Sequence, residues 1–191
     1  LLNSEGIKDS GKSDTETLIK CLNYLGLEKT LSILDGMFAF AYYDLKKGKL
    51  YLARDRIGEK PLYFSKENNF FIFSSEIKAI FKSNLKNFKP NSEMFHEIFL
   101  HGKIYGKQTA FKDIFELEPG TFLNLNVKKN EYIIKNYWTL EDVEKTDKNI
   151  SKDLFEEKFN ECITSRLTSD IPVGSLISGG IDSSSLAYKI L

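Results

Sequence analysis

Hydrophobic residues follow a helical period near the start of the chain. In residues 14–25 the apolar positions recur every three or four residues, and this spacing predicts an amphipathic helix. They are Leu18, Ile19, Leu22 and Leu25. Ser13 stands where an N-cap belongs, and Glu16 follows three positions later, as in a capping box. A shorter helical turn is expected over residues 29–34.

The pattern changes to strands at residue 37. The continuous aromatic run 37–44 predicts a strand that is covered on both faces. The sequence Lys46-Lys47-Gly48 is typical of a hairpin turn that returns the chain into a partner strand. Further strands are expected at residues 50–53, 61–64, 70–74, 121–126 and 131–138, and helices at 76–82 and 93–100. This order predicts an α+β fold of antiparallel hairpins with flanking helices.

A different organisation is expected towards the end of the chain. The charged segment 141–150 lacks apolar periodicity and is interpreted as a linker. Ser151 is a good N-cap for an amphipathic helix, residues 173–177 suggest a short buried strand, and another helix begins near Asp182. The apolar side of the first helix comprises Leu154, Phe155, Phe159, Cys162, Ile163 and Leu167. We therefore expect one domain at 1–140 and the start of an α/β domain at 151–191.

Charge and cysteine content exclude several classes of function. Lys and Arg together number 27, as do Asp and Glu, so the formal net charge is zero. A dedicated binder of nucleic acid or of an anionic membrane needs an excess or a patch of basic residues. The balance of charges therefore removes the electrostatic case for both classes. No apolar run approaches the ~20 residues of a membrane span. Cys21 and Cys162 cannot form a disulfide framework, which favours reduced thiols and a cytoplasmic location.

Residues 178–184, Ser-Gly-Gly-Ile-Asp-Ser-Ser, form the most specific chemical motif. They lie between a predicted strand and a predicted helix. Glycines let the backbone approach a ligand closely, and free N–H groups at a helix start suit a phosphate or pyrophosphate. Asp182 offers a carboxylate for a magnesium ion that bridges phosphates. The spacing and the Lys of a Walker A loop are absent. A Ser/Gly turn with an ordinary N-cap is the alternative interpretation.

This motif and the segments before it resemble glutamine-hydrolysing asparagine synthetases. Residues 170–174 and 178–184 are similar to the pyrophosphate loop of these enzymes, which belong to the AMP-forming ATP pyrophosphatases. Earlier segments resemble the second half of their glutaminase domain and keep its order: residues 13–16, 34–41, 53–63 and 74–79. The resemblance covers nearly the whole chain.

The resemblance implies a fold and a reaction. The first part is expected to be a partial N-terminal-nucleophile amidohydrolase, an αββα sandwich of antiparallel sheets. The second part is expected to be the first elements of a PP-loop α/β domain. Such an enzyme hydrolyses glutamine and uses the ammonia, with Mg-ATP, to convert aspartate to asparagine through a β-aspartyl-AMP intermediate. The implied ligands are glutamine, aspartate, ATP and magnesium, and a homodimer is one assembly open to such an enzyme.

The resemblance also assigns site residues. Asp14 matches the carboxylate that holds the α-ammonium of glutamine, whereas by itself it would only complement a helix dipole at the first turn. ATP and pyrophosphate are expected at Ile177, Ser178, Gly179, Gly180, Asp182, Ser183 and Ser184. Within this set, Asp182 is the expected metal ligand.

Two departures from the family restrict what the chain is expected to do. The N-terminal Cys nucleophile has no counterpart, because Cys21 and Cys162 both lie in predicted helices, so no catalytic residue is assigned. The chain starts at Leu1 without a start signal and stops inside an apolar stretch. We therefore expect a fragment that is truncated at both ends and inactive by itself.

Other interpretations stay open at the level of sequence. A related amidotransferase could act on another carboxylate, such as a sugar acid in polysaccharide biosynthesis, and a non-catalytic adenylate-binding scaffold could keep the same fold. The turn Arg54-Asp55-Arg56 is interpreted as a local ion-pair network that supports the hairpins, although it could face the glutamine site.

Overall fold

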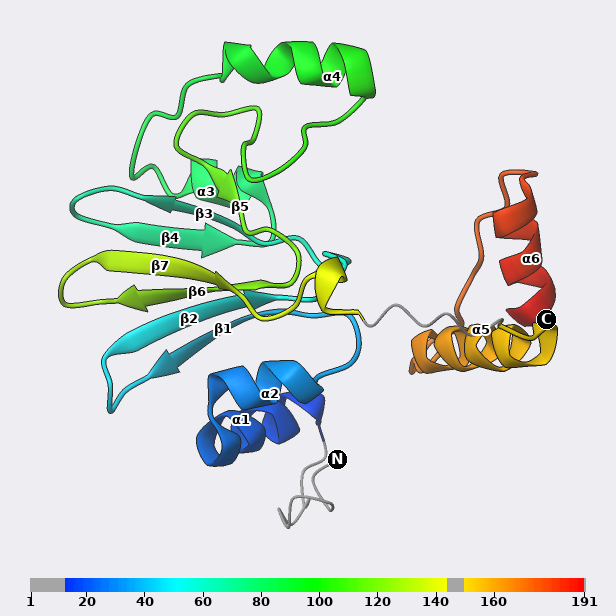
Figure 1. Ribbon diagram of the computed structural model, residues 1–191. Coiled ribbons are helices and arrows are strands. Elements are labelled where there is room, and N and C mark those ends of the chain that lie inside the picture. Colours follow the sequence, from blue (N-terminus) through cyan, green and yellow to red (C-terminus); the bar gives the residue numbers. More distant parts are fainter. Residues whose placement is uncertain (1–12, 144–149, 191) are drawn as a thin grey trace. The chain divides into compact units, whose positions relative to one another are not determined.

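The computed structural model describes residues 13–143 and 150–190. The chain divides into two compact units, Leu1–Val143 and Glu144–Leu191, which we call the N-terminal unit and the C-terminal unit (Figure 1). Most of the predicted linker, residues 144–149, lies outside the described residues, as does the predicted start at Leu1. The linker and the domain limits therefore stay predictions.

Two helices open the N-terminal unit. Helix α1 spans Asp14–Leu25, the predicted range, and the Ser13 hydroxyl accepts a hydrogen bond from the Glu16 N–H at 3.2 Å. The Glu16 carboxylate pairs with Lys20 at 2.9 Å, so the structure has the N-cap half of the predicted capping box. Helix α2 spans Leu27–Ile33. Gly26 separates the two helices with a φ of +80°, a conformation that favours glycine.

In the described part of the chain, seven strands form two antiparallel sheets. The four-stranded sheet has the order β1-β2-β6-β7, and the three-stranded sheet has the order β4-β3-β5. The first comprises β1 (Ala39–Asp44), β2 (Lys49–Arg54), β6 (Thr121–Asn126) and β7 (Glu131–Asn136). The second comprises β3 (Tyr63–Lys66), β4 (Phe71–Ser74) and β5 (Phe115–Glu116). The β1–β2 hairpin turns at the predicted Lys46-Lys47-Gly48 sequence.

The alternation of side chains along the strands builds four layers. Leu52 of β2 and Leu123 of β6 face the three-stranded sheet and pack with Phe64 of β3 in the central core. The next residue of β2, Ala53, points the other way and packs with Leu31 of α2. Helix α3 (Ile77–Lys82) covers the outer face of the three-stranded sheet through Ile80. The αββα sandwich of antiparallel sheets is confirmed (Figure 1).

The residues 37–44 are rich in aromatic side chains for a different reason than the predicted burial on both faces. Strand β1 is an edge strand of its sheet, and none of its six residues is fully buried. Tyr43 remains 47% exposed. The run is apolar because Phe38 and Phe40 pack against the cluster beneath α2. The prediction of a strand covered on both faces was therefore wrong.

The remaining described elements of the N-terminal unit are short helices. Helix α4 spans Phe95–His101, after the 3-10 turn η1 at Ser92–Met94. A second 3-10 turn, η2, spans Leu140–Asp142. Phe99 and Leu100 on α4 are largely exposed.

The C-terminal unit consists of two helices in its described part, residues 150–190. Helix α5 (Lys152–Arg166) begins after Ser151, whose hydroxyl accepts a hydrogen bond from the Leu154 N–H at 3.2 Å. Helix α6 spans Ile181–Ile190. The predicted apolar side of α5 buries Ile163, but Phe155 remains 60% exposed.

The strand predicted at 173–177 is absent, and no strand occurs in residues 150–190. A buried parallel strand exists only when neighbouring strands take up its backbone hydrogen bonds and helices cover its faces. Leu176 is instead 96% exposed in the described structure. The first elements of an α/β domain are thus represented by helices alone. Within the described residues, no helix has the length and apolar character required to cross a membrane.

Candidate functional site

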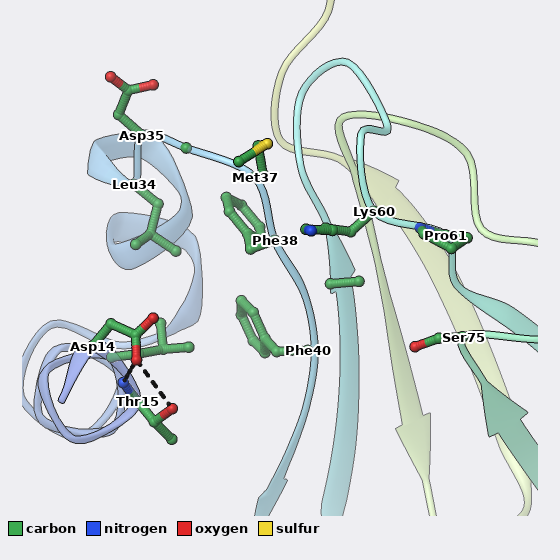
Figure 2. A pocket seen from close by; sticks show the side chains of 13 residues that line it. Asp14, Thr15, Leu34, Asp35, Met37, Phe38, Phe40, Lys60, Pro61 and Ser75 are labelled. Atoms are coloured by element: carbon green, nitrogen blue, oxygen red, sulfur yellow. Dashed lines mark hydrogen bonds between the residues drawn. The ribbon is translucent and has the colours of Figure 1, made fainter. Parts of the chain in front are cut away.

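A cavity of about 510 Å³ lies at the start of helix α1 in the N-terminal unit. One wall is α1 with Asp14 and Leu18, and a second wall is the segment 34–40. The segment after β2 contributes Lys60 and Pro61, and Ser75 follows β4. Figure 2 shows that the labelled residues among them come from separate segments of the chain. The cavity therefore collects residues from all four segments of this unit that carry the family resemblance, residues 13–16, 34–41, 53–63 and 74–79.

Asp14 lines this cavity as the first residue of α1. Its carboxylate accepts hydrogen bonds from the N–H of Thr15 at 2.7 Å and from the Thr15 hydroxyl at 3.4 Å (Figure 2). Among the described residues, no cation forms an ion pair with Asp14. The positive end of the helix dipole stabilises a carboxylate at this position. Asp14 thus presents a carboxylate that can hold an ammonium ion.

Lys60 supplies the positive charge among the described residues that line the cavity. Figure 2 shows its side chain extending from the segment after β2 towards Phe38. Met37, Phe38 and Phe40 make the adjoining wall apolar. Lys60 stands inside the segment 53–63 that resembles the family, but its sequence position alone gave no reason to assign it to a cavity.

Asp55 lies behind this wall and is almost completely buried, with 1% of its surface exposed. One carboxylate oxygen, Oδ1, accepts N–H hydrogen bonds from Ile57, Gly58 and Glu59 at 3.2, 2.7 and 2.9 Å. The other oxygen, Oδ2, accepts from Lys60 at 3.0 Å and from Phe38 at 3.3 Å. Burial would raise the pKa of Asp55, but the hydrogen bonds from these N–H groups outweigh it and lower the pKa below 3.8.

The Arg54 side chain holds the segment 58–60 through the carbonyl groups of its backbone. Its guanidinium donates to the carbonyl oxygens of Lys60 at 2.8 Å, Gly58 at 2.9 Å and Leu117 at 2.7 Å. It also pairs with the carboxylate of Glu116 at 2.7 Å. Arg54 is only 6% exposed. The segment 58–60 is therefore fixed through both its N–H and its C=O groups.

The predicted ion-pair network at Arg54-Asp55-Arg56 differs from what the structure contains. The two arginines pair outside the turn, Arg54 with Glu116 and Arg56 with Asp35 at 4.0 Å. Asp55 accepts hydrogen bonds from backbone groups instead. The turn supports the cavity wall, and sequence spacing could not reveal this because Phe38 is 17 positions away from Asp55.

The predicted phosphate loop lies in the C-terminal unit, before and within the first turn of α6. The Ser183 hydroxyl lies 3.0 Å from the Ser178 hydroxyl and donates to the Gly180 carbonyl at 3.2 Å. The Ser184 N–H donates to the same carbonyl at 3.1 Å. Gly179 has a φ of +84° and open space where a Cβ would be. The serines and glycines thus form one connected loop.

The loop residues do not all line one cavity. Asp182 and Ser184 line a cavity of about 780 Å³ beside α5, together with Lys152, Phe155 and Lys189. Ile177, Ser178, Gly179, Gly180 and Ser183 do not line it, and Ile177 is 64% exposed. The described structure therefore brings together the hydroxyls of Ser178 and Ser183, but does not gather all the predicted residues around one cavity.

The described residues contain no group of three or more His, Cys, Asp or Glu side chains that could hold a metal ion alone. Magnesium is commonly bound by one or two carboxylates together with the phosphate oxygens of a nucleotide. Asp182 supplies one such carboxylate at the first turn of α6. This donor set fits a magnesium ion that arrives with a nucleotide, and does not fit a resident metal cage.

Comparison with known proteins assigns both units to related enzymes. The model of the glutamine amidotransferase domain family matches residues 1–138, and the asparagine synthase model matches residues 154–189. A putative asparagine synthetase (glutamine-hydrolyzing) 2 of Methanocaldococcus jannaschii is 37% identical over 180 residues, which are 91% of this chain and 34% of that protein. Asparagine synthetase (glutamine-hydrolyzing) 3 of Bacillus subtilis is 35% identical, and the match covers 97% of this chain and 30% of that protein.

A third relative has a different name. The amidase chry2 of Gibberella zeae is 31% identical over 192 aligned positions, and the match covers 98% of this chain and 28% of that protein. The chain spans about a third of the length of the curated relatives it matches. The resemblance to glutamine-hydrolysing asparagine synthetases is confirmed by these matches. Since the first family model covers residues 1–138 of 191, the chain belongs to the glutamine amidotransferase domain family.

Proposed function

We propose that this chain is part of an enzyme that makes asparagine from aspartate, ATP and glutamine. The observation that carries the proposal is the order of the two family matches, the glutamine amidotransferase domain followed by asparagine synthase. Relatives named asparagine synthetase (glutamine-hydrolyzing) match across both units at 35–37% identity. The N-terminal unit takes up glutamine, and the C-terminal unit contributes to the site for ATP.

Glutamine binds in the cavity at the start of α1. Asp14 holds the α-ammonium group, because its carboxylate lines the cavity and forms no ion pair among the described residues. A free amino acid presents a fixed cation that a carboxylate recognises through a charge-assisted hydrogen bond. The apolar wall of Met37, Phe38 and Phe40 contacts the methylene groups of the substrate. No residue of this chain is assigned as the nucleophile that attacks the amide.

ATP binds at the loop from Ile177 to Ser184. The hydroxyls of Ser178, Ser183 and Ser184 and the N–H groups at the start of α6 provide donors for the phosphates. Gly179 leaves space for close approach of a phosphate group. Asp182 holds the magnesium ion that accompanies the nucleotide. When bound, this ion neutralises phosphate charge while the aspartate carboxylate is adenylated.

A reducing, cytoplasmic setting belongs to the same proposal. Cys21 and Cys162 are both free, although Cys162 is exposed. Free exposed thiols persist where the surroundings keep them reduced.

The function is tested with the full-length protein. Aspartate, Mg-ATP and either glutamine or free ammonia are supplied, and asparagine, AMP and pyrophosphate are measured. We expect all three products in equal amounts with both nitrogen sources. Formation of ADP and phosphate instead of AMP and pyrophosphate would contradict the proposal, as would glutamine hydrolysis without any aspartate-dependent use of ATP.

The match to an amidase supports a second candidate function. The relative named amidase chry2 aligns over both units at 31% identity. A chain of this family could therefore transfer the amide nitrogen to a carboxylate other than that of aspartate. A panel of carboxylic acids, including sugar acids, assayed for AMP release separates the two functions. Release that depends on aspartate alone rejects the second candidate.

A further inference from the structure

One buried carboxylate connects two walls of the glutamine cavity. Oδ2 of Asp55 accepts hydrogen bonds from the N–H of Phe38 at 3.3 Å and from the N–H of Lys60 at 3.0 Å. Both donors belong to residues that line the cavity: Phe38 precedes β1 and Lys60 follows β2, so both segments leave the β1–β2 hairpin at its open end, away from the turn. A single oxygen atom therefore bonds both segments.

Neighbouring bonds reinforce this connection. The N–H of Asp55 donates to the carbonyl of Phe38 at 2.9 Å, so Phe38 is held through both of its backbone groups. The carbonyl of Lys60 accepts from the Nε atom of Arg54 at 2.8 Å, so Lys60 is held in the same way. Asp55 and Arg54 are both buried, and water does not compete for these charge-assisted bonds.

We propose that Asp55 is a positioning residue for glutamine: it fixes the Phe38 wall relative to the Lys60 wall and so sets the shape of the cavity. The inference rests on the proposed function, because it assumes that this cavity takes up glutamine. Asp55 lies behind the wall and acts through Phe38 and Lys60, without contact with the substrate. Displacement of a positioning wall by about an ångström is enough to change substrate binding strongly.

The chemistry of the two oxygens explains why a carboxylate is required. Oδ1 accepts three N–H groups, with the shortest distance 2.7 Å to Gly58, whereas Oδ2 accepts the two bonds that join the walls. Asparagine has the same shape but only one accepting oxygen. In Asp55→Asn that oxygen satisfies the larger group of donors. The amide NH₂ then faces the N–H groups of Phe38 and Lys60, and the connection between the walls is lost.

The experiment compares three variants of the full-length protein. Asp55→Asn breaks the connection, and Asp14→Asn removes the proposed contact with the substrate. Asp44→Asn is the matched control, because the Asp44 carboxylate also accepts a backbone N–H, that of Lys47 at 3.0 Å, but in the turn between β1 and β2. The KM for glutamine, kcat with glutamine and kcat with ammonia are measured for each.

We expect Asp55→Asn to raise the KM for glutamine about tenfold and to change the ammonia-dependent kcat by less than about twofold. Asp44→Asn leaves all three constants unchanged. If Asp55→Asn lowers both activities by one factor with an unchanged KM, Asp55 is merely structural and the inference is wrong. If Asp14→Asn leaves glutamine kinetics unchanged, the proposed glutamine site itself fails, and the inference falls with it.

A measurement on the unaltered full-length protein covers the case in which Asp55→Asn does not fold. Hydrogen exchange of residues 36–40 and 57–61 is followed with and without L-glutamate, the product of glutamine hydrolysis. Because one oxygen joins Phe38 and Lys60, ligand binding should slow exchange in both segments by a similar factor and leave the turn at 45–48 unchanged. Slower exchange in one segment alone, or in neither, overturns the inference.

Discussion

The two units of the chain support their candidate sites in different ways. In the N-terminal unit, the cavity wall at Lys60 is backed by Asp55, which is 1% exposed, and by Arg54, which is 6% exposed. In the C-terminal unit, the loop before α6 is held by hydrogen bonds among exposed groups, and the adjacent Leu176 is 96% exposed. Hydrogen bonds that water can replace contribute less to stability than buried ones.

This difference shows which parts of the structure determine the shape of each site. The cavity in the N-terminal unit is supported by the sandwich of two sheets and their helices, so its geometry is part of the fold. The loop before α6 is instead held by hydrogen bonds among Ser178, Ser183 and Gly180. We therefore expect substitutions in the loop to change chemistry with little effect on stability. Substitutions behind the cavity should change stability as well.

The largest expected effect is on ATP chemistry. Asp182→Ala in the full-length protein should reduce asparagine and pyrophosphate formation by a factor of about 10³, since loss of a metal-bound charge costs several kcal/mol in the transition state. Glutamine hydrolysis and the melting temperature should change little. Asp153→Ala, in the first turn of α5, is the control and should retain activity. Equal loss of asparagine formation in Asp182→Ala and Asp153→Ala would contradict a specific role of Asp182 in ATP chemistry.

A large effect on stability is expected behind the cavity. Gly58 has a φ of +75°, and an added Cβ would lie 2.7 Å from the Cγ atom of Pro119. Gly58→Ala should lower the free energy of unfolding by about 2–4 kcal/mol through strain and steric overlap. Gly48→Ala has a similar φ of +61° but open space around it, and should cost only about 1 kcal/mol. Chemical denaturation measures both, and equal costs would show that overlap at Gly58 is unimportant.

The next effect separates substrate binding from stability. Asp14→Asn should raise the KM for glutamine about 10- to 100-fold, because a charged hydrogen bond contributes about 1.5–3 kcal/mol. Activity with free ammonia should stay nearly intact. Glu16→Gln, on the same turn of α1, should lose only its surface pair with Lys20 and leave the KM unchanged. A collapse of ammonia-dependent synthesis in Asp14→Asn would make Asp14 structural.

The smallest effect concerns Tyr137 behind the same wall. Its hydroxyl donates to the carbonyl of Arg54 at 2.8 Å, and burial raises its pKa from 10.0 to about 12. Tyr137→Phe should cost about 1 kcal/mol at pH 7, and Tyr42→Phe, which loses a bond to Asn23 at the surface, should cost less.

The raised pKa also predicts a dependence on alkaline pH. A tyrosine whose pKa is higher in the folded state stabilises the fold fully below its unfolded pKa, and this contribution is lost as pH rises through the folded pKa. The native protein should therefore lose stability from Tyr137 between pH 10 and about 12. Tyr137→Phe should lack this component in denaturation curves. Identical pH profiles would indicate that Tyr137 is solvated in solution.

Local signals in the sequence predicted most elements but not their environment. The bounds of α1 were predictable because the N-cap at Ser13 and the apolar spacing act within a few residues. Strand β5 was missed, since Phe115–Glu116 is too short to show a period and forms only through pairing with β3. The strand at 173–177 was predicted from its apolar content, yet a strand also requires partners, and residues 150–190 contain none.

The candidate site could be predicted in part. Asp14 and the loop at 178–184 were accessible through motifs that resemble the family. Asp55 was predicted only as part of a turn that supports the hairpins or faces the glutamine site. Its bond to Phe38, 17 positions away, and the place of Lys60 in the cavity could not be predicted from the sequence. A buried Asp that accepts five backbone N–H groups has no signature in composition or spacing. Its role is apparent only in the folded hairpin, where the start of β1 lies beside the end of β2.

The two bonds between Asp55 and Phe38 close one end of the β1–β2 hairpin, and the other end turns at Lys46-Lys47-Gly48. The shape of the cavity is set at the closed end, so the length of the turn is free to vary. This makes the turn a suitable place to insert a peptide tag or attach a fluorescent probe. A reporter there would follow folding of the sandwich without disturbing the cavity.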